Sequence, residues 1–182
     1  MNVIVAITGA SGAIYARQCI EILLASKHVE RIARVISRHG EDVIEAEGVT
    51  PPEDCRIERY ANDDMWSSLA SGSAHWDAML VVPASMGSVG RIASGVSQSL
   101  IERAADVMLK ERRRLVLVVR ETPYSLIHLR NMTTITEAGG IILPASPSFY
   151  FQPADIETLA LTVSHRAVEM LGIGIEHPSW GE

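Results

Sequence analysis

Arg120 and Glu121 are the neighbouring side chains of this sequence with the clearest capacity for chemistry. They follow five unbroken apolar residues, 115–119, a run short enough to be a strand buried on both faces. Ligands of open parallel sheets bind just beyond the carboxyl ends of the strands. The pair therefore offers an anion-binding guanidinium beside a possible proton donor. The alternative is a surface ion pair that closes a strand.

Small residues and hydroxyls follow three other predicted strands. Residues 9–12, Gly-Ala-Ser-Gly, come after an apolar run and open a helical pattern, so their N–H groups can approach a phosphate. They match neither the GxGxxG motif nor a P-loop. Tight turns between a strand and a helix contain glycine for purely steric reasons about as often as for phosphate binding. Ser37 and residues 85–88 follow two further strands, although serine is also a routine cap residue.

Further cations and one phenol are candidates for a second anion. Arg103 and Lys110 lie seven residues apart, hence on one helical face, within a basic segment that ends at residue 114. A solvated helix face is the ordinary interpretation of that segment. Tyr150 and Arg166 would make a good phosphate-binding pair if the fold brought them together.

The elements that must position these residues alternate along the chain. Apolar runs predict strands over residues 3–8, 31–36, 78–83, 115–119 and 141–143. Helical spacing predicts helices over residues 13–25, 41–47, 89–94, 98–112, 125–138 and 155–171. Residues 53–73 are expected to form a long connection with one helical turn near 65–69. This alternation predicts a single α/β domain, residues 1–182, with a doubly wound parallel sheet.

Composition excludes several classes of protein. The 182 residues are 47% hydrophobic and 21% charged, which is typical of a globular chain and not of a disordered one. A net charge of −6 without a basic tail argues against nucleic-acid binding, and the longest apolar runs are too short to cross a membrane. The amino terminus does not resemble a signal peptide. Cys19 and Cys55 lack CxxC spacing, which favours reduced thiols in the cytoplasm. No histidine pairing predicts a metal site.

Longer motifs give the chain a specific resemblance. They are TGASGAIY at 8–15, PASMGSVGRIASG at 83–95, the segment 100–132 with AADV-LKERR-LVLV-RETP, GGIILPASPSFYFQP at 139–153, and the terminal WGE. In these motifs the chain resembles UbiX-type flavin prenyltransferases over nearly its whole length. It departs from them at Ala84, where cysteine is usual, at Val119, where proline is frequent, and at Tyr124, which could alter the pocket.

The resemblance implies a fold, a reaction and partners. The fold would be three-layered, Rossmann-like and flavodoxin-like. The activity would join the dimethylallyl group of dimethylallyl phosphate to N5 and C6 of reduced FMN, without a metal. The product would pass to a UbiD-type decarboxylase, and the enzyme would be a dodecamer with sites between subunits.

The resemblance also implies residue roles. FMN would be held by Gly9, Ala10, Ser11, Ser37, Ser85, Met86, Gly87, Ser88 and Arg120. The prenyl phosphate would be held by Lys110, Arg120, Tyr150 and Arg166, with Arg103 near the flavin or an interface. Ser11, Glu47 and Glu121 would be catalytic: Ser11 near N5, Glu47 in proton movement around N5, and Glu121 at the departing phosphate. Trp180 would close the pocket of a neighbouring chain.

Two other functions remain open at this point. A flavin-dependent decarboxylase of the phosphopantothenoylcysteine type would need an early catalytic histidine and a substrate-recognition asparagine motif. His39 is the only early histidine that could qualify, and it follows the second predicted strand instead of the first helix. A non-enzymatic FMN carrier would not need Glu121, Lys110, Tyr150 and Arg166 to converge.

Overall fold

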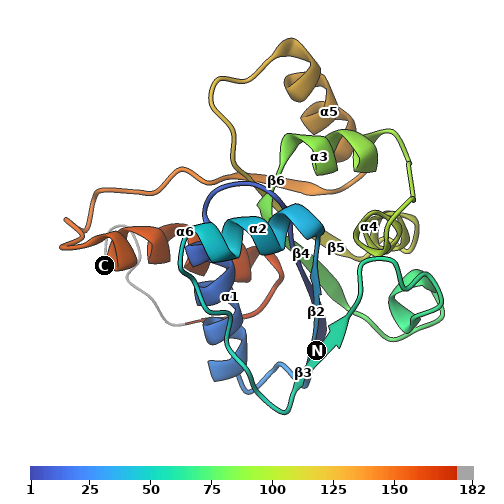
Figure 1. Ribbon diagram of the computed structural model, residues 1–182, viewed down its shortest axis with the longest axis horizontal. Helices are drawn as coiled ribbons and strands as arrows, with labels where there is room; N and C mark the ends of the chain where they lie inside the picture. The colour runs from blue at the N-terminus through green and yellow to red at the C-terminus, as the bar shows by residue number, and fades with distance from the viewer. Residues whose placement is uncertain (176–182) are drawn as a thin grey trace.

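The computed structural model describes residues 1–175, which form a six-stranded parallel sheet with helices on both faces (Figure 1). The strands are β1 (Asn2–Ile7), β2 (Arg31–Ile36), β3 (Ile57–Tyr60), β4 (Ala78–Ala84), β5 (Arg114–Val119) and β6 (Ile141–Pro144). The helices are α1 (Ala13–Ala25), α2 (Arg38–Ala46), α3 (Met86–Ala93), α4 (Leu100–Lys110), α5 (Leu126–Glu137) and α6 (Ile156–Met170). A short 3-10 turn covers Ser68–Ala70.

The strand order confirms the predicted doubly wound fold. The order across the sheet is β3-β2-β1-β4-β5-β6, and every adjacent pair is parallel. Without the edge strand β3, the remaining strands have the flavodoxin-like order 2-1-3-4-5. The chain reverses its direction of winding between β1 and β4. Ligands of such folds bind at this reversal, beyond the carboxyl ends of the strands.

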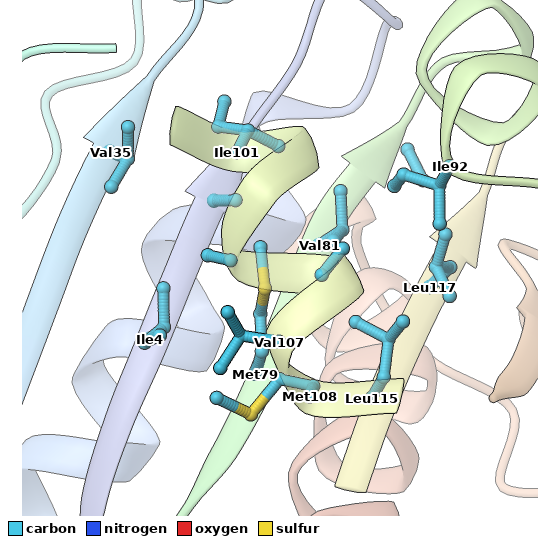
Figure 2. Close-up of a cluster of buried hydrophobic side chains, with 14 of the residues drawn as sticks. Ile4, Val35, Met79, Val81, Ile92, Ile101, Val107, Met108, Leu115 and Leu117 are labelled. Atoms are coloured by element: carbon cyan, nitrogen blue, oxygen red, sulfur yellow. The ribbon is translucent and has the colours of Figure 1, made fainter. Parts of the chain in front are cut away.

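Two apolar layers hold the helices on the sheet, because the central strands are apolar on both faces. Strand β4 is buried at every position. On one face, side chains such as Ile4, Met79 and Leu115 pack against Val107 and Met108 of α4 (Figure 2). On the other face, residues from the same strands pack against α1 and α6. The sheet is therefore a rigid platform for the loops at its carboxyl edge.

The structure corrects one prediction and sharpens two others. Residues 53–73 contain the strand β3, which the charged sequence Ile-Glu-Arg-Tyr does not signal. It forms because it pairs with β2 at the sheet edge, where Arg34 holds the preceding loop through Pro52 O (2.8 Å) and Glu53 (2.7 Å). Helices α2 and α3 begin earlier than predicted, directly after Ser37 and Ser85.

The described residues also bear on the predictions about cysteines, metal sites and membrane helices. Burial raises the pKa of the Cys19 thiol to about 12, and Cys55 is exposed; both are free thiols. In residues 1–175 no cluster of three or more His, Cys, Asp or Glu side chains is placed to hold a metal ion. Across the same residues, no helix combines the length and the apolar character needed to cross a membrane.

Candidate active site

Thr8 joins the carboxyl ends of β1 and β4, the two strands at the winding reversal. Its Oγ1 donates to Pro83 O at 2.7 Å and accepts from Ser85 N–H at 2.8 Å, and the residue is almost completely buried. Both hydrogen bonds lie inside the protein, where an unsatisfied partner would be costly. The loop that begins at Gly9 is thereby fixed relative to the loop that begins at Ser85.

The amino end of α2 packs directly on the end of β1. Ser37 N–H donates to Ile7 O at 2.9 Å, and the Ser37 hydroxyl caps α2 by accepting from Gly40 N–H at 3.1 Å. A Cβ at Gly9 would lie 2.5 Å from His39 Cβ, and one at Gly40 would lie 2.7 Å from Ile7 O. Glycine is required at both positions because the two backbones approach too closely for a side chain.

A cavity of about 450 Å³ opens where these three strand ends meet. This volume lies within the roughly 300–1,000 Å³ typical of small-molecule sites. Its lining residues are Gly9, Ser37, Arg38, His39, Asn62, Ser85, Gly87, Ser88, Arg91, Gln98, Ser99, Ile101 and Glu102. Five of the predicted FMN-binding residues are among them: Gly9, Ser37, Ser85, Gly87 and Ser88. Ala10 and Met86 are buried next to this set.

Glu47 reaches back to the first turn of α1 from the end of α2. Its carboxylate accepts from Gly12 N–H at 2.9 Å and from Ala13 N–H at 2.7 Å. Gly12 has φ +114° and no side-chain cap, so Glu47 supplies the acceptor that an N-cap residue normally provides. The predicted catalytic residues Ser11 and Glu47 therefore lie together, since the Ser11 hydroxyl also hydrogen-bonds to this carboxylate.

The electrostatics of this cluster keep Glu47 ionised. Desolvation by burial raises the Glu47 pKa, but the hydrogen bonds from Gly12, Ser11 and Ala13 outweigh it, and Arg120 adds to them, so the net pKa is lowered. The pKa of Tyr15 is raised by burial, with Arg120 acting against this shift and Glu47 in its favour. Arg120 thus acts on both groups.

Arg120 and Glu121 lie at the tip of β5, beside the loop after β4. Arg120 N–H donates to Ala84 O at 3.3 Å. Glu121 is half-buried, and its carboxylate accepts from Thr122 N–H at 3.0 Å. Four strand ends therefore contribute to one edge of the sheet, as the sequence predicts.

Lys110 lies toward the other end of β5. It ends α4, just before β5 begins, and pairs with Glu111. Six strand residues at about 3.3 Å each separate the start of β5 from Arg120 by about 20 Å. One chain therefore does not bring Lys110 to Arg120 and Glu121. Arg166 is on α6, four residues before its end, and pairs with Glu169 at 3.2 Å.

Tyr150 is largely exposed on the loop before α6. Ser148 N–H donates to Thr162 Oγ1 at 3.1 Å, so this loop lies along the helix that carries Arg166, one turn before it. Trp180 lies outside the described residues. Sequence reasoning overlooked Thr8 and Tyr15, although both belong to the 8–15 motif and helical spacing places Tyr15 one turn after Ser11.

The residues present fit a flavin mononucleotide. Small residues at the β1 and β4 loops, among them Gly9 and Gly87, leave room for a flat polar ring. Two serine-capped helices, α2 and α3, begin at the cavity and favour a phosphate, which Arg38 and Arg91 can also neutralise. The fold and the site thus define a flavin-binding α/β protein.

Comparison with known proteins supports a flavin-binding protein and identifies its family. Residues 1–170 match the family described as Flavoprotein. The flavin prenyltransferase UbiX of Methanocaldococcus jannaschii is 40% identical over 176 residues, covering 95% of this chain and 94% of that protein. The UbiX enzyme of Pseudomonas aeruginosa is 38% identical over 197 residues, covering 100% and 94%. The chain belongs to the UbiX-type flavin prenyltransferases.

Solved structures give the same assignment. AnUbiX (PadA1), solved in complex with FMN and dimethylallyl pyrophosphate, has a TM-score of 0.89 at 39% identity, with 98% of each chain covered. A dodecameric FMN-dependent UbiX-like decarboxylase from Escherichia coli O157:H7 has a TM-score of 0.90 at 34% identity, with both chains covered completely. A phosphopantothenoylcysteine-type (PPC) decarboxylase, at 16% identity and TM-score 0.63, shares the fold alone.

Proposed function

We propose that this enzyme transfers the dimethylallyl group of dimethylallyl phosphate to N5 and C6 of reduced FMN. One observation carries the proposal beyond family membership: Ser11 and Arg120 act on the Glu47 carboxylate, which binds the end of the loop whose first residue, Gly9, lines the cavity. When bound, reduced FMN supplies the two nucleophilic atoms. As N5 bonds to the prenyl group, the allylic C–O bond breaks with its electron pair going to the phosphate, and N5 gives up its proton. The C6–C bond then forms at the prenyl double bond, whose other carbon takes up a proton while C6 loses one to the phosphate.

Ser11 and Glu47 act on the flavin side of this reaction. The Glu47 carboxylate accepts a hydrogen bond from the Ser11 hydroxyl and is itself fixed by two backbone N–H groups of α1. Its lowered pKa keeps the carboxylate ionised at neutral pH, so that it is a hydrogen-bond acceptor for this hydroxyl. We assign to Ser11 the orientation of the N5 region and to Glu47 the movement of a proton there.

Arg120, Glu121, Lys110, Tyr150 and Arg166 act on the phosphate side. An allylic ester that ionises needs a sink for the negative charge, which guanidinium, ammonium and phenol donors supply. Glu121 protonates or hydrogen-bonds the departing phosphate. Holding both reactants in line in one pocket supplies a further part of the acceleration.

The separation of these residues within one chain supports a site shared between copies. Lys110 lies just before the start of β5, and Arg120 follows its last residue. We therefore propose that neighbouring copies complete the site, in a dodecamer like that of the E. coli relative. Large apolar side chains exposed at α5, before α6 and at its first residue are consistent with burial between copies: Leu126, Ile127, Phe149, Phe151 and Ile156.

Two further assignments rest on the resemblance. The prenylated flavin would be delivered to a UbiD-type decarboxylase, because the product is a cofactor and the reaction consumes one FMN for each product formed. A cytoplasmic location is supported by the two free cysteines, Cys19 and Cys55.

A direct experiment tests the transfer. Purified protein is incubated anaerobically with reduced FMN and dimethylallyl phosphate, and the flavin mass is measured afterwards. A gain of one dimethylallyl unit is expected; unchanged flavin with retained FMN binding would identify a carrier instead. A parallel incubation with the diphosphate, present in the AnUbiX complex, determines which donor this enzyme prefers.

A further inference from the structure

Arg91 is a cation of the cavity to which neither the sequence motifs nor the reaction assigns a role. It lies on α3, less than one turn after Ser88, and lines the cavity together with Ser85 and Gly87. Its Nη2 lies 3.4 Å from Ser88 Oγ, and its Nη1 lies 3.3 Å from where a Gly87 Cβ would be. The guanidinium therefore lies over the first turn of α3, where the helix presents its N–H groups.

A buried carboxylate holds this guanidinium in place. The Glu102 side chain is 5% exposed, and its Oε1 accepts from Arg91 Nε. Its Oε2 accepts from Gln98 N–H at 2.9 Å and Ser99 N–H at 3.1 Å, at the start of α4. Because Glu102 is shared between Arg91 and the amino end of α4, it fixes the Nε edge of Arg91. The side chain is 47% exposed, and Nη1 and the second N–H of Nη2, beyond the one that donates to Ser88 Oγ, can donate to a ligand.

The charge distribution along the site indicates what this guanidinium binds. At the α1 side of the Gly9 loop stands the ionised carboxylate of Glu47, which would repel a phosphate. At the α3 side stand Arg91 and the serine-capped amino end of α3, with Arg38 at the start of α2. An elongated ligand with one dianionic end is therefore oriented with that end toward α3.

We propose that Arg91, oriented by Glu102, is a positioning residue that binds the phosphate group of the flavin nucleotide. This inference rests on the proposed function only in taking FMN as the ligand of the cavity. Arginine is suited to the role because its planar fork donates to two phosphate oxygens while its Nε donates to the carboxylate. Lysine carries all its donors on one nitrogen, so it cannot be held by Glu102 at a separate nitrogen while it binds the phosphate.

Binding of oxidised FMN and of riboflavin, which lacks the phosphate, separates this role from a structural one. Flavin fluorescence titration is carried out on the wild type, Arg91→Gln and Arg91→Lys. Arg91→Gln is expected to weaken FMN binding by about 10- to 100-fold, the effect of one lost charged hydrogen-bonding group, and to leave riboflavin binding within about twofold. The FMN affinity of Arg91→Lys should lie between those of the wild type and Arg91→Gln. Equal losses for both flavins, or no loss for FMN, would overturn the inference.

Further variants isolate the role of Glu102. Glu102→Gln should lower FMN affinity selectively, whereas Lys27→Gln, which removes a positive charge at the opposite edge of the sheet, should change neither affinity. If Glu102→Gln fails to fold, Arg91→Lys provides the test, since it keeps the charge and loses the Nε contact. In turnover, Arg91→Gln should raise the KM for FMN and leave kcat at saturating FMN unchanged; a loss of kcat alone would contradict a positioning role.

The outcomes distinguish this inference from the proposed function. The flavin titrations measure binding without prenyl transfer. If the wild type binds FMN through Arg91 but transfers no prenyl group, the reaction assignment fails and the phosphate assignment stands. If transfer occurs but Arg91→Gln weakens FMN binding relative to riboflavin binding no more than Lys27→Gln does, the reaction assignment stands and the phosphate assignment fails.

Discussion

The Glu47 carboxylate lies 2.9 Å from Gly12 N, so the end of α2 caps the beginning of α1 across 35 residues of sequence. This contact links a structural task to a chemical one. It satisfies N–H groups that Gly12 cannot cap itself, and it holds the carboxylate beside Ser11 and Arg120. Changes at Glu47 should therefore affect stability and transfer together.

Glu47→Gln is expected to lower the free energy of unfolding by about 1 kcal/mol at neutral pH, the usual effect of a lost helix cap. Because the folded-state pKa of Glu47 lies below its ordinary value of 4.5, the difference from wild type should be complete above that pH. It should disappear as the pH falls through the lowered folded-state pKa. Urea denaturation of both proteins over a pH series measures this.

Glu45→Gln is the matched control, because Glu45 is an exposed carboxylate on the same helix. It should show no comparable pH-dependent difference. If the two variants behave alike, the cap contributes nothing specific to stability.

Gly9→Ala should weaken FMN binding and destabilise the fold by about 1–3 kcal/mol, the usual range for overpacking. The added Cβ would lie 2.5 Å from His39 Cβ, so α2 must move away from the end of β1. Thermal denaturation and FMN titration measure the two effects. Gly174→Ala, where no heavy atom lies within 4 Å of the added Cβ, should change neither. A Gly9→Ala protein with wild-type affinity would show that this close approach is not needed for the site.

Much of the fold and part of the site can be predicted from the sequence, for identifiable physical reasons. The central strands β1, β4 and β5 are apolar runs because both faces are buried, and the serines after strands mark the helix starts at the cavity. Strand β3 has no such pattern because an edge strand with charged residues depends on its neighbour. The Arg91–Glu102 pair joins two helices across a loop, and no periodicity reports that contact.

The position of Lys110 relative to Arg120 shows what motif reasoning leaves open. The two residues are ten positions apart in one motif, which suggests a shared site. Strand β5 lies between them, however, and the residues before and after a strand lie at opposite ends of that strand. The resemblance supplies the residues, but the distribution of those residues over copies has to come from the geometry.

Glu121→Gln should bind FMN normally and lose about 100-fold or more in turnover, within the range for a lost general acid. The glutamine side chain has a similar size and cannot deliver a proton to the departing phosphate. FMN titration and the anaerobic mass assay measure binding and transfer separately. Glu137→Gln, at the end of α5, is the control and should remain active. Full activity of Glu121→Gln would exclude Glu121 as the acid.

Lys110→Gln should raise the concentration of dimethylallyl phosphate needed for half-maximal rate and leave FMN affinity unchanged. If a neighbouring copy supplies Lys110, co-expression of Lys110→Gln chains with Glu121→Gln chains should restore activity. Some sites in a mixed oligomer then combine Glu121 from one copy with Lys110 from another and are intact, which is impossible when both residues act within one chain. The same two proteins, purified separately and assayed without exchange, provide the baseline. Because the start and the end of β5 are about 20 Å apart, a mixed preparation no more active than that baseline would place Lys110 outside the phosphate site.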